Sequence, residues 1–280
     1  MQDKALLTIA ARLAEVPGVV AVALGGSRAR GTHRPDSDID LGLYYRGPLA
    51  VADLRALAHE LTGADTEVTE PGGWGPWVDG GGWLDVDGWR VDWIYRELGR
   101  VQAIWRECVA GHYETGIQAG HPLGFYSHAY AGEVAMCRIL ADPTGELTAL
   151  RAQVAAYPPA LRAALVRGLW EAGFALQIAR YGAAGRDPAY TAGCLFRAIG
   201  VACHALHAAD GAWLINEKGM VAAAGRLPSA PDGFADRAQA LLASVGQTPE
   251  EMERAIAGAE RLIAEVRTAC DSALRGETGQ

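Results

Sequence analysis

The sequence predicts an α+β chain in two parts, an N-terminal domain of strands and helices followed by a C-terminal helical bundle. Before about residue 115, apolar segments with strand-like alternation are interleaved with helical segments and with turns rich in Gly, Pro and Asp. After that point nearly every segment carries Ala, Leu and Val at helical spacing. We therefore expect a first domain over residues 1–118 and a helical domain over residues 119–280.

The N-terminal elements follow from local patterns. Helical spacing predicts helices over 4–15 and 51–61, and short apolar runs rich in β-branched or alternating residues predict strands over 19–24 and 39–45. Residues 82–95 predict a hairpin, because two alternating segments meet at the strong turn signal Asp87-Gly88. The Gly- and Trp-rich stretch 71–82, just before this hairpin, is expected to be a mobile loop over the site. In the second part, helices are expected over 147–155, 160–181, 189–209, 233–244 and 249–272.

A glycine-serine loop follows the first predicted strand. Gly25 and Gly26 end the strand at a point where a side chain would block the close approach of a ligand. Ser27 is expected to cap the turn of helix that begins there, so that backbone N–H groups and its hydroxyl face an anion. The pattern therefore predicts that a phosphate binds on Gly26 and Ser27.

Three aspartates are candidate metal ligands. Asp38 and Asp40 flank one apolar residue at the start of a predicted strand, where alternate side chains share a face, and hard oxygen ligands of this kind suit Mg²⁺. Two cations about 4 Å apart need a further anionic ligand. Asp92, between Val91 and Trp93 on an apolar strand, is hard to explain as solvated surface and is the candidate third ligand and general base. Asp85 and Asp87 are interpreted as turn residues.

These residues carry a resemblance to a known family. Gly26-Ser27, then Asp38-Ile39-Asp40, then the lone strand aspartate Asp92 resemble the pattern of the DNA polymerase beta-like nucleotidyltransferase superfamily. The string from Gly26 to Leu41 is most similar to its small bacterial branch, which includes aminoglycoside, lincosamide and minimal nucleotidyltransferases. The resemblance covers roughly the first 100 residues.

The resemblance implies a mixed sheet flanked by helices and a Mg²⁺-dependent reaction. An acceptor hydroxyl attacks the α-phosphorus of a nucleoside triphosphate, with ATP the expected donor, and pyrophosphate leaves. Asp38 and Asp40 would hold two Mg²⁺ ions, while Asp92 would share the catalytic metal and take the acceptor proton. The resemblance does not name the acceptor.

Further charged residues are candidate ligands. Lysine occurs only at Lys4 and Lys218, and in the resembled enzymes a helical-domain lysine reaches the triphosphate, so Lys218 is a candidate phosphate ligand. An exposed helix-end charge is the alternative. Glu217 is a weaker candidate for orienting an acceptor amine or hydroxyl. Arg28 is a candidate phosphate contact, whereas Arg30 is expected to pair with an acidic neighbour.

Aromatic and titratable residues outside this pattern receive structural interpretations. The tryptophans at 74, 77, 83, 89 and 93 are interpreted as core or lid residues, with Trp74 or Trp77 the candidates for stacking on a base or sugar. His204 and His207 lack a carboxylate at matching spacing and are interpreted as packed. The cysteines, an odd number of five, are interpreted as reduced core thiols.

Composition narrows the class of function. The formal net charge of −8 argues against binding of long nucleic acid and favours a small, cationic acceptor. No apolar run approaches the roughly 20 residues of a membrane helix and no signal pattern is present, so a cytoplasmic location without membrane contact is expected. A homodimer is compatible with the sequence.

Two other functions compete with small-molecule modification. One is an antitoxin-like nucleotidyltransferase that AMPylates a protein or modifies RNA. The other is a catalytically inactive binding module, which the three carboxylates in register disfavour. An antibiotic is among the acceptors that the resemblance implies for a small-molecule enzyme.

Overall fold

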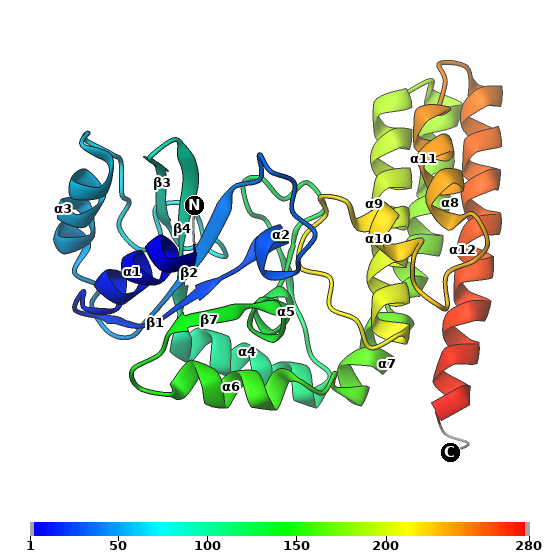
Figure 1. Cartoon of the computed structure of the whole chain (residues 1–280). Helices are drawn as coiled ribbons and strands as arrows, with labels where there is room; N and C mark the ends of the chain where they lie inside the picture. The colour runs from blue at the N-terminus through cyan, green and yellow to red at the C-terminus, as the bar shows by residue number, and fades with distance from the viewer. Residues whose placement is uncertain (1–2, 278–280) are drawn as a thin grey trace. The chain divides into compact units, whose positions relative to one another are not determined.

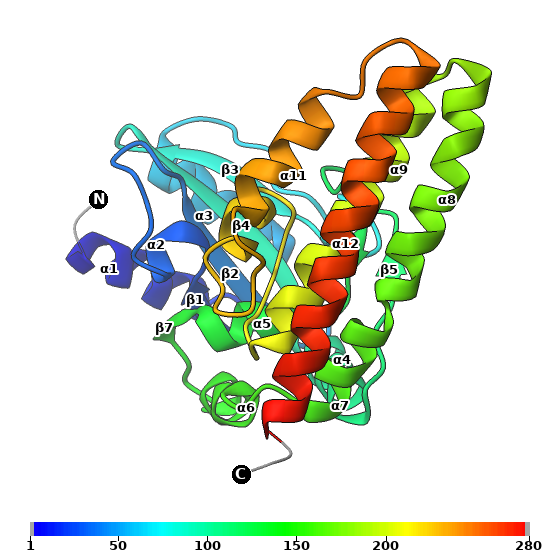
Figure 2. The ribbon, with the colours of Figure 1, turned by 90° about the vertical axis from the view of Figure 1, so that its right-hand side faces the viewer.

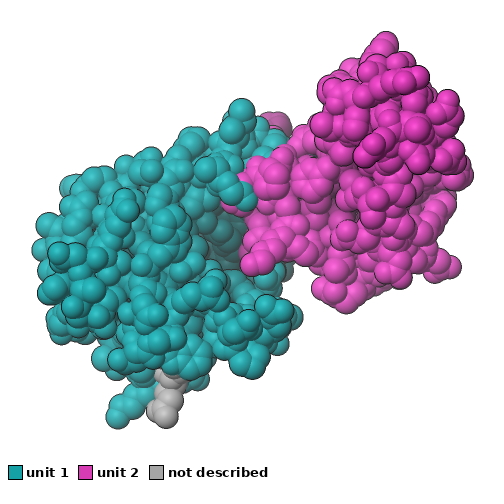
Figure 3. Space-filling view, turned by 90° about the horizontal axis from the view of Figure 1, so that it is seen from above, with its two compact units in different colours: residues 1–106, 114–120, 124–156 teal, residues 107–113, 121–123, 157–280 magenta. Residues whose placement is uncertain are grey.

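The computed structural model describes residues 3–277, which divide into two compact units. Unit 1 comprises residues 3–106, 114–120 and 124–156, and unit 2 comprises residues 107–113, 121–123 and 157–277 (Figure 3). The sheet and the candidate site lie in unit 1, and the long helices lie in unit 2.

Unit 1 is built on a five-stranded sheet with the order β3-β4-β2-β1-β7 (Figure 1). The strands are β1 (Val19–Leu24), β2 (Ile39–Tyr45), β3 (Gly81–Val86), β4 (Trp89–Glu97) and β7 (Arg138–Ala141). β2 and β4 run parallel, whereas the other neighbours are antiparallel. The expected fold class, a mixed sheet flanked by helices and followed by a helical region, is confirmed.

Helices cover both faces of this sheet. α1 (Asp3–Ala14) and α3 (Val51–Thr62) bury leucines such as Leu13 and Leu54 in one core with Leu41, Leu43 and Trp93 of the strands. On the opposite face, Arg96 of β4 forms a buried ion pair with Glu133 of α5 (Ala129–Met136), with Nε 2.6 Å from Oε2. The remaining elements of this region are α2 (Gly26–Ala29), α4 (Leu98–Ala110), α6 (Glu146–Val154) and the small antiparallel pair β5 (Thr115–Gly116) and β6 (Phe125–Tyr126).

Local patterns predicted most of these elements. β1 and β2 have the expected bounds, and α1, α3 and α6 end within one residue of theirs. The predicted hairpin is present, and its turn is formed by Asp87 and Gly88. Their φ angles of 53° and 77° place both residues in the left-handed region, as in a tight two-residue turn.

The sequence predicts a nearly all-helical region after residue 115, and it does not predict the strands β5, β6 and β7 that lie there. Residues 138–141 pair with β1 at the edge of the sheet. A four-residue segment is too short for its periodicity to separate a strand from a helix. Because β7 belongs to the sheet, residues 124–156 group with unit 1, beyond the boundary at 118/119 expected from the sequence.

Unit 2 is helical. Its helices are α7 (Pro159–Arg167), α8 (Leu169–Gly185), α9 (Pro188–Ala209), α10 (Met220–Ala224), α11 (Phe234–Ala243) and α12 (Pro249–Glu277). The three long helices α8, α9 and α12 pack together (Figure 2). The single helix expected over 160–181 is instead two helices, because the chain breaks at Gly168.

The central helix of unit 2 is strongly apolar. Among residues 3–277, only α9 is long and apolar enough to cross a membrane, which the sequence analysis had not anticipated. However, 78% of its apolar window is buried among the other helices, as expected for a core helix. His204 and His207 are buried in α9, and burial lowers the pKa of His207. The five cysteines are free and buried, as predicted.

Candidate active site

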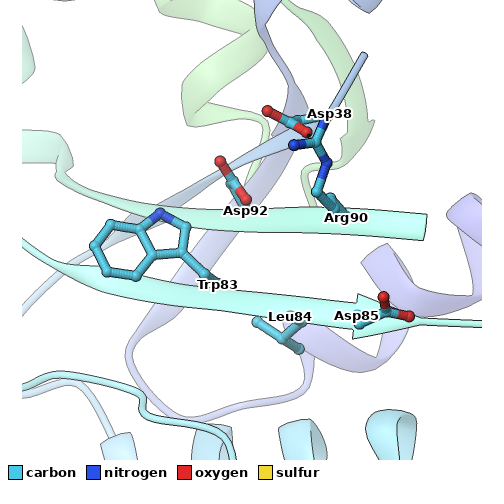
Figure 4. A pocket seen from close by; sticks show the side chains of 6 residues that line it. All are labelled: Asp38, Trp83, Leu84, Asp85, Arg90 and Asp92. Carbon is cyan, nitrogen blue, oxygen red and sulfur yellow. Dashed lines mark ion pairs between the residues drawn. The ribbon is translucent and has the colours of Figure 1, made fainter. Parts of the chain in front are cut away.

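The three predicted carboxylates gather at one end of the central strands. β2 and β4 pair in parallel register with Asp40 opposite Asp92, and Asp38 lies two residues before Asp40. Asp38 and Asp92 line one pocket together with Arg90 (Figure 4). Residues that are far apart in the sequence thus form one anionic cluster.

The environment of Asp92 makes it a weaker acid than an ordinary aspartate. Burial, with the negative charges of Asp40 and then Asp38, raises the pKa of Asp92 to about 6, while Arg90 partly opposes the shift. A carboxylate with this pKa is ionised at neutral pH, yet accepts a proton more readily than a solvated aspartate. Asp92 is therefore suited to act as a general base.

The glycine-serine loop lies directly against Asp40. The backbone N–H of Gly25 donates to the Asp40 carbonyl oxygen at 2.8 Å. Gly26 has a φ of 59°, and a Cβ on it would lie 1.8 Å from Oδ2 of Asp40. Only glycine therefore allows the loop to approach the carboxylate this closely.

The role expected for Ser27 as a helix cap was wrong. α2 begins at Gly26, so Ser27 lies within the helix, and the cap residue Gly25 has no side chain to offer. The backbone still places Ser27 in the first turn, directly after Gly26. Its contact with a phosphate stays a prediction.

Arg28 holds the segment that precedes Asp38. Its Nε donates to the carbonyl oxygens of Ser37 and Asp38, each at 3.1 Å, and Nη2 donates to Ser37 at 2.7 Å. The guanidinium also lies over the ring of Trp89, 5.2 Å from its centroid. In this structure Arg28 positions the Asp38 loop, whereas the sequence predicted a phosphate contact.

Arg30 donates to the Gly26 carbonyl oxygen at 3.2 Å, not to an acidic neighbour as expected.

Arg90 is a site residue that the sequence analysis missed. Its Nε lies 2.6 Å from Oδ1 of Asp38. Its Nη2 donates to the Asp36 carbonyl oxygen at 2.9 Å. The alternation of β4 places Arg90 on the same face as Asp92, and this was the available signal. The guanidinium is thus the counter-ion of the carboxylate cluster.

The donor set fits a hard cation in its chemistry. Asp38, Asp40 and Asp92 supply carboxylate oxygens. The pKa of Asp92 is raised first by burial and then by repulsion from Asp40 and Asp38, and a cation would relieve the repulsion. Nevertheless, among residues 3–277 no three His, Cys, Asp or Glu side chains are arranged to hold a metal ion. Asp38 is engaged by Arg90 instead, so a metal has to compete with this guanidinium.

Arg90→Gln is therefore expected to tighten Mn²⁺ binding without nucleotide by about fivefold, the equivalent of an ion pair of roughly 1 kcal/mol. Titration of the full chain with Mn²⁺, followed by electron paramagnetic resonance, measures the free ion. Arg34→Gln is the matched control, because Arg34 pairs with Asp36 near the cluster. Equal affinities of the parent and Arg90→Gln would contradict this competition.

The loop expected to be mobile is fastened on several sides. Gln118, itself buried, accepts from the backbone N–H groups of Trp77 and Val78 at 2.9 Å and donates to the Trp74 carbonyl oxygen at 2.8 Å. The hydroxyl of Tyr45 donates to Asp79 at 2.5 Å. These bonds fix the loop beside the pocket.

The two candidates from the helical region lie in unit 2. Lys218 is exposed in the turn before α10. Glu217 is bound to His121 Nδ1 and accepts from the backbone N–H of Leu123, both at 3.1 Å. Burial opposes ionisation of Glu217, but the hydrogen bond with His121, the charge of His121 and two backbone hydrogen bonds together outweigh burial, so the pKa of Glu217 is lowered. Roles of Lys218 and Glu217 in substrate binding stay predictions.

Two comparisons with known proteins find a match. A family model described as a nucleotidyltransferase domain matches residues 4–69, the segment that contains Gly26, Ser27, Asp38 and Asp40. A crystal structure of a nucleotidyltransferase-like protein from Exiguobacterium sibiricum 255-15 is similar with a TM-score of 0.47 and 14% sequence identity, covering 97% of this chain and 77% of that one. The search of curated proteins finds no match. Residues 4–69 thus match a nucleotidyltransferase domain.

Proposed function

We propose that the enzyme transfers a nucleoside monophosphate, with ATP the expected donor, to a hydroxyl of a small-molecule acceptor and releases pyrophosphate. The observation that carries this proposal is the register of β2 and β4, which sets Asp40 beside Asp92 and next to the Gly26 loop. A triphosphate on that loop has its α-phosphorus near the residue best suited to take a proton.

In this reaction, residues of the chain bind the triphosphate and accept the proton of the acceptor hydroxyl. The Gly26–Ser27 backbone binds and orients the triphosphate. Asp92 takes the proton of the acceptor hydroxyl as its oxygen bonds to the α-phosphorus, and the bond to the pyrophosphate oxygen breaks. Asp38, Asp40 and Asp92 would hold Mg²⁺, which when bound stabilises charge on the phosphate oxygens.

A small acceptor fits both the pocket and the charge of the protein. The pocket beside Asp92 has a volume of about 450 Å³, within the range of small-ligand sites. The net charge of −8 disfavours long nucleic acid, as a phosphate backbone requires clustered basic residues. We place the enzyme in the cytoplasm, where nucleoside triphosphates are available, and include antibiotics among its acceptors.

The proposal is tested by incubating the protein with Mg²⁺ and one labelled triphosphate, ATP, GTP, CTP or UTP. Each triphosphate is supplied in turn with a small-molecule library, a cell protein extract or RNA as the source of acceptors. We expect pyrophosphate release and a nucleoside monophosphate added to a small molecule, detected by mass spectrometry. Asp40→Asn is the matched inactive control. Label on protein or RNA alone would overturn the acceptor class, and no turnover of any triphosphate would overturn the activity.

Lys218→Ala is expected to weaken triphosphate affinity by about tenfold or more, because a charge-assisted contact contributes about 1.5–3 kcal/mol. Calorimetric titration with a non-hydrolysable ATP analogue measures this change. Lys4→Ala is the matched control, since Lys4 is the other lysine of the chain and is exposed on α1. Equal affinities for the parent and Lys218→Ala would instead identify Lys218 as an exposed surface charge.

A further inference from the structure

An exposed tryptophan stands beside the candidate base. Trp83 of β3 is opposite Asp92 in the antiparallel register of β3 and β4. It is 64% exposed and lines the same pocket as Asp38, Asp92 and Arg90 (Figure 4). The sequence predicts a core or lid residue here, but Trp83 shares the exposed face of β3 with Asp85.

The indole of Trp83 is held by a second indole. Trp74 stacks on it with ring centroids 4.5 Å apart and planes 14° apart. The backbone of Trp74 is fixed by Gln118, and a Cβ on Gly81 would lie 3.0 Å from the Trp74 ring. Trp74 and Trp83 therefore form an aromatic platform set in place before any ligand binds.

The strand order indicates whether this platform lies on the side of the triphosphate or on the side of the acceptor. The Gly26 loop follows β1 and contacts Asp40 on β2, Asp92 follows on β4, and Trp83 lies beyond it on β3. A triphosphate bound at Gly26 therefore lies on one side of the carboxylates, and the platform lies on the other. This is the side from which the attacking hydroxyl approaches in an in-line displacement.

We propose that Trp83, backed by Trp74, is an acceptor subsite that stacks on the flat face of a saturated polyhydroxylated ring, a sugar or cyclitol. The inference rests on the proposed function for its orientation. An indole offers an apolar face to ring C–H groups. The carboxylate of Asp85 and the guanidinium of Arg90, both on the pocket wall, hydrogen-bond with ring hydroxyls. The ring then presents one hydroxyl to Asp92.

Saturation-transfer NMR tests ring binding without any turnover. With the full chain and methyl β-D-glucopyranoside at millimolar concentration, we expect saturation of the ring C–H protons, and much less of the acyclic polyol glycerol. Trp83→Ala should lower the ring signal about fivefold, whereas Trp83→Phe should retain most of it. Trp170→Ala is the matched control, because Trp170 is also 64% exposed but lies on α8 of unit 2.

A second arm separates an acceptor ring from a nucleobase. ATP and inorganic tripolyphosphate, which lacks a base, are titrated into the parent and Trp83→Ala. We expect both affinities to stay unchanged. A loss of ATP affinity with unchanged tripolyphosphate affinity would overturn the proposal, because the platform would then bind the base.

The proposal of an acceptor subsite would also be overturned by either of two NMR results. One is the absence of a ring signal in the parent, and the other is an equal ring signal in the parent and in Trp83→Ala. Loss of the ring signal in Trp83→Ala would support the subsite even if the nucleotidyl transfer assay failed, so the two failures are distinguishable.

Discussion

Asp40→Asn is expected to lower Mg²⁺-dependent triphosphate turnover by more than about 100-fold and to leave the fold intact. Loss of a residue that merely supports a metal ligand already costs about 10- to 100-fold, and Asp40 is a candidate ligand itself. Asp40 also contacts the Gly26 loop, and Asn keeps the size of the side chain. Steady-state pyrophosphate release and a thermal melt measure the two properties.

The matched control for this change is Asp36→Asn, an exposed aspartate in the loop before β2. We expect Asp38→Asn to behave like Asp40→Asn, since both carboxylates belong to the same cluster. Turnover within a few-fold of the parent in Asp40→Asn would remove Asp40 from the site. A collapse of the melting temperature would show that its role is structural.

Asp92→Asn is the second change with a large expected effect. Loss of a general base lowers kcat by roughly 10²-fold or more, while affinity for the triphosphate persists. The parent enzyme's kcat/KM should rise with pH as Asp92 loses its proton and then level off, and this acidic limb should move to lower pH as the Mg²⁺ concentration rises, because a bound cation opposes the upward pKa shift of the metal-free site. Asp92→Asn should lose this acidic limb. An unchanged pH profile in the variant would contradict the assignment of the base.

Asp92 also makes a testable contribution to stability. The pKa of Asp92 is about 6 in the folded chain and near 3.8 when the carboxyl is solvated. As the pH rises above about 4, the Asp92 carboxyl therefore loses its proton in the unfolded chain before it does so in the folded chain. The ionised carboxylate therefore opposes folding, and its penalty grows as the pH rises from about 4 to 6. We expect Asp92→Asn to melt no lower than the parent at pH 8, and its relative stability to fall at pH 4. A variant that melts lower at pH 8 would identify Asp92 as a structural residue.

Local sequence was enough for the parts of the site that depend on nearby residues. The apolar run before Gly25 predicted β1, and Asp87-Gly88 predicted the hairpin turn. These signals arise from steric and side-chain preferences that extend over a few residues. The same reasoning was wrong for Arg30, because the folded backbone of the loop brings the Gly26 carbonyl oxygen to its guanidinium.

The sequence by itself determined the fold class and the chemical composition of the site: a glycine loop, paired aspartates and a third aspartate on an apolar strand. Only the tertiary structure decided which of these groups meet. The parallel register opposes Asp40 to Asp92, Arg90 engages Asp38, and Trp74 stacks on Trp83. These contacts join residues that are distant in the chain, so strand register and packing fix them and local periodicity does not. The raised pKa of Asp92 is a consequence of the same assembly, because burial causes most of it and the neighbouring charges of Asp40 and Asp38 add to it.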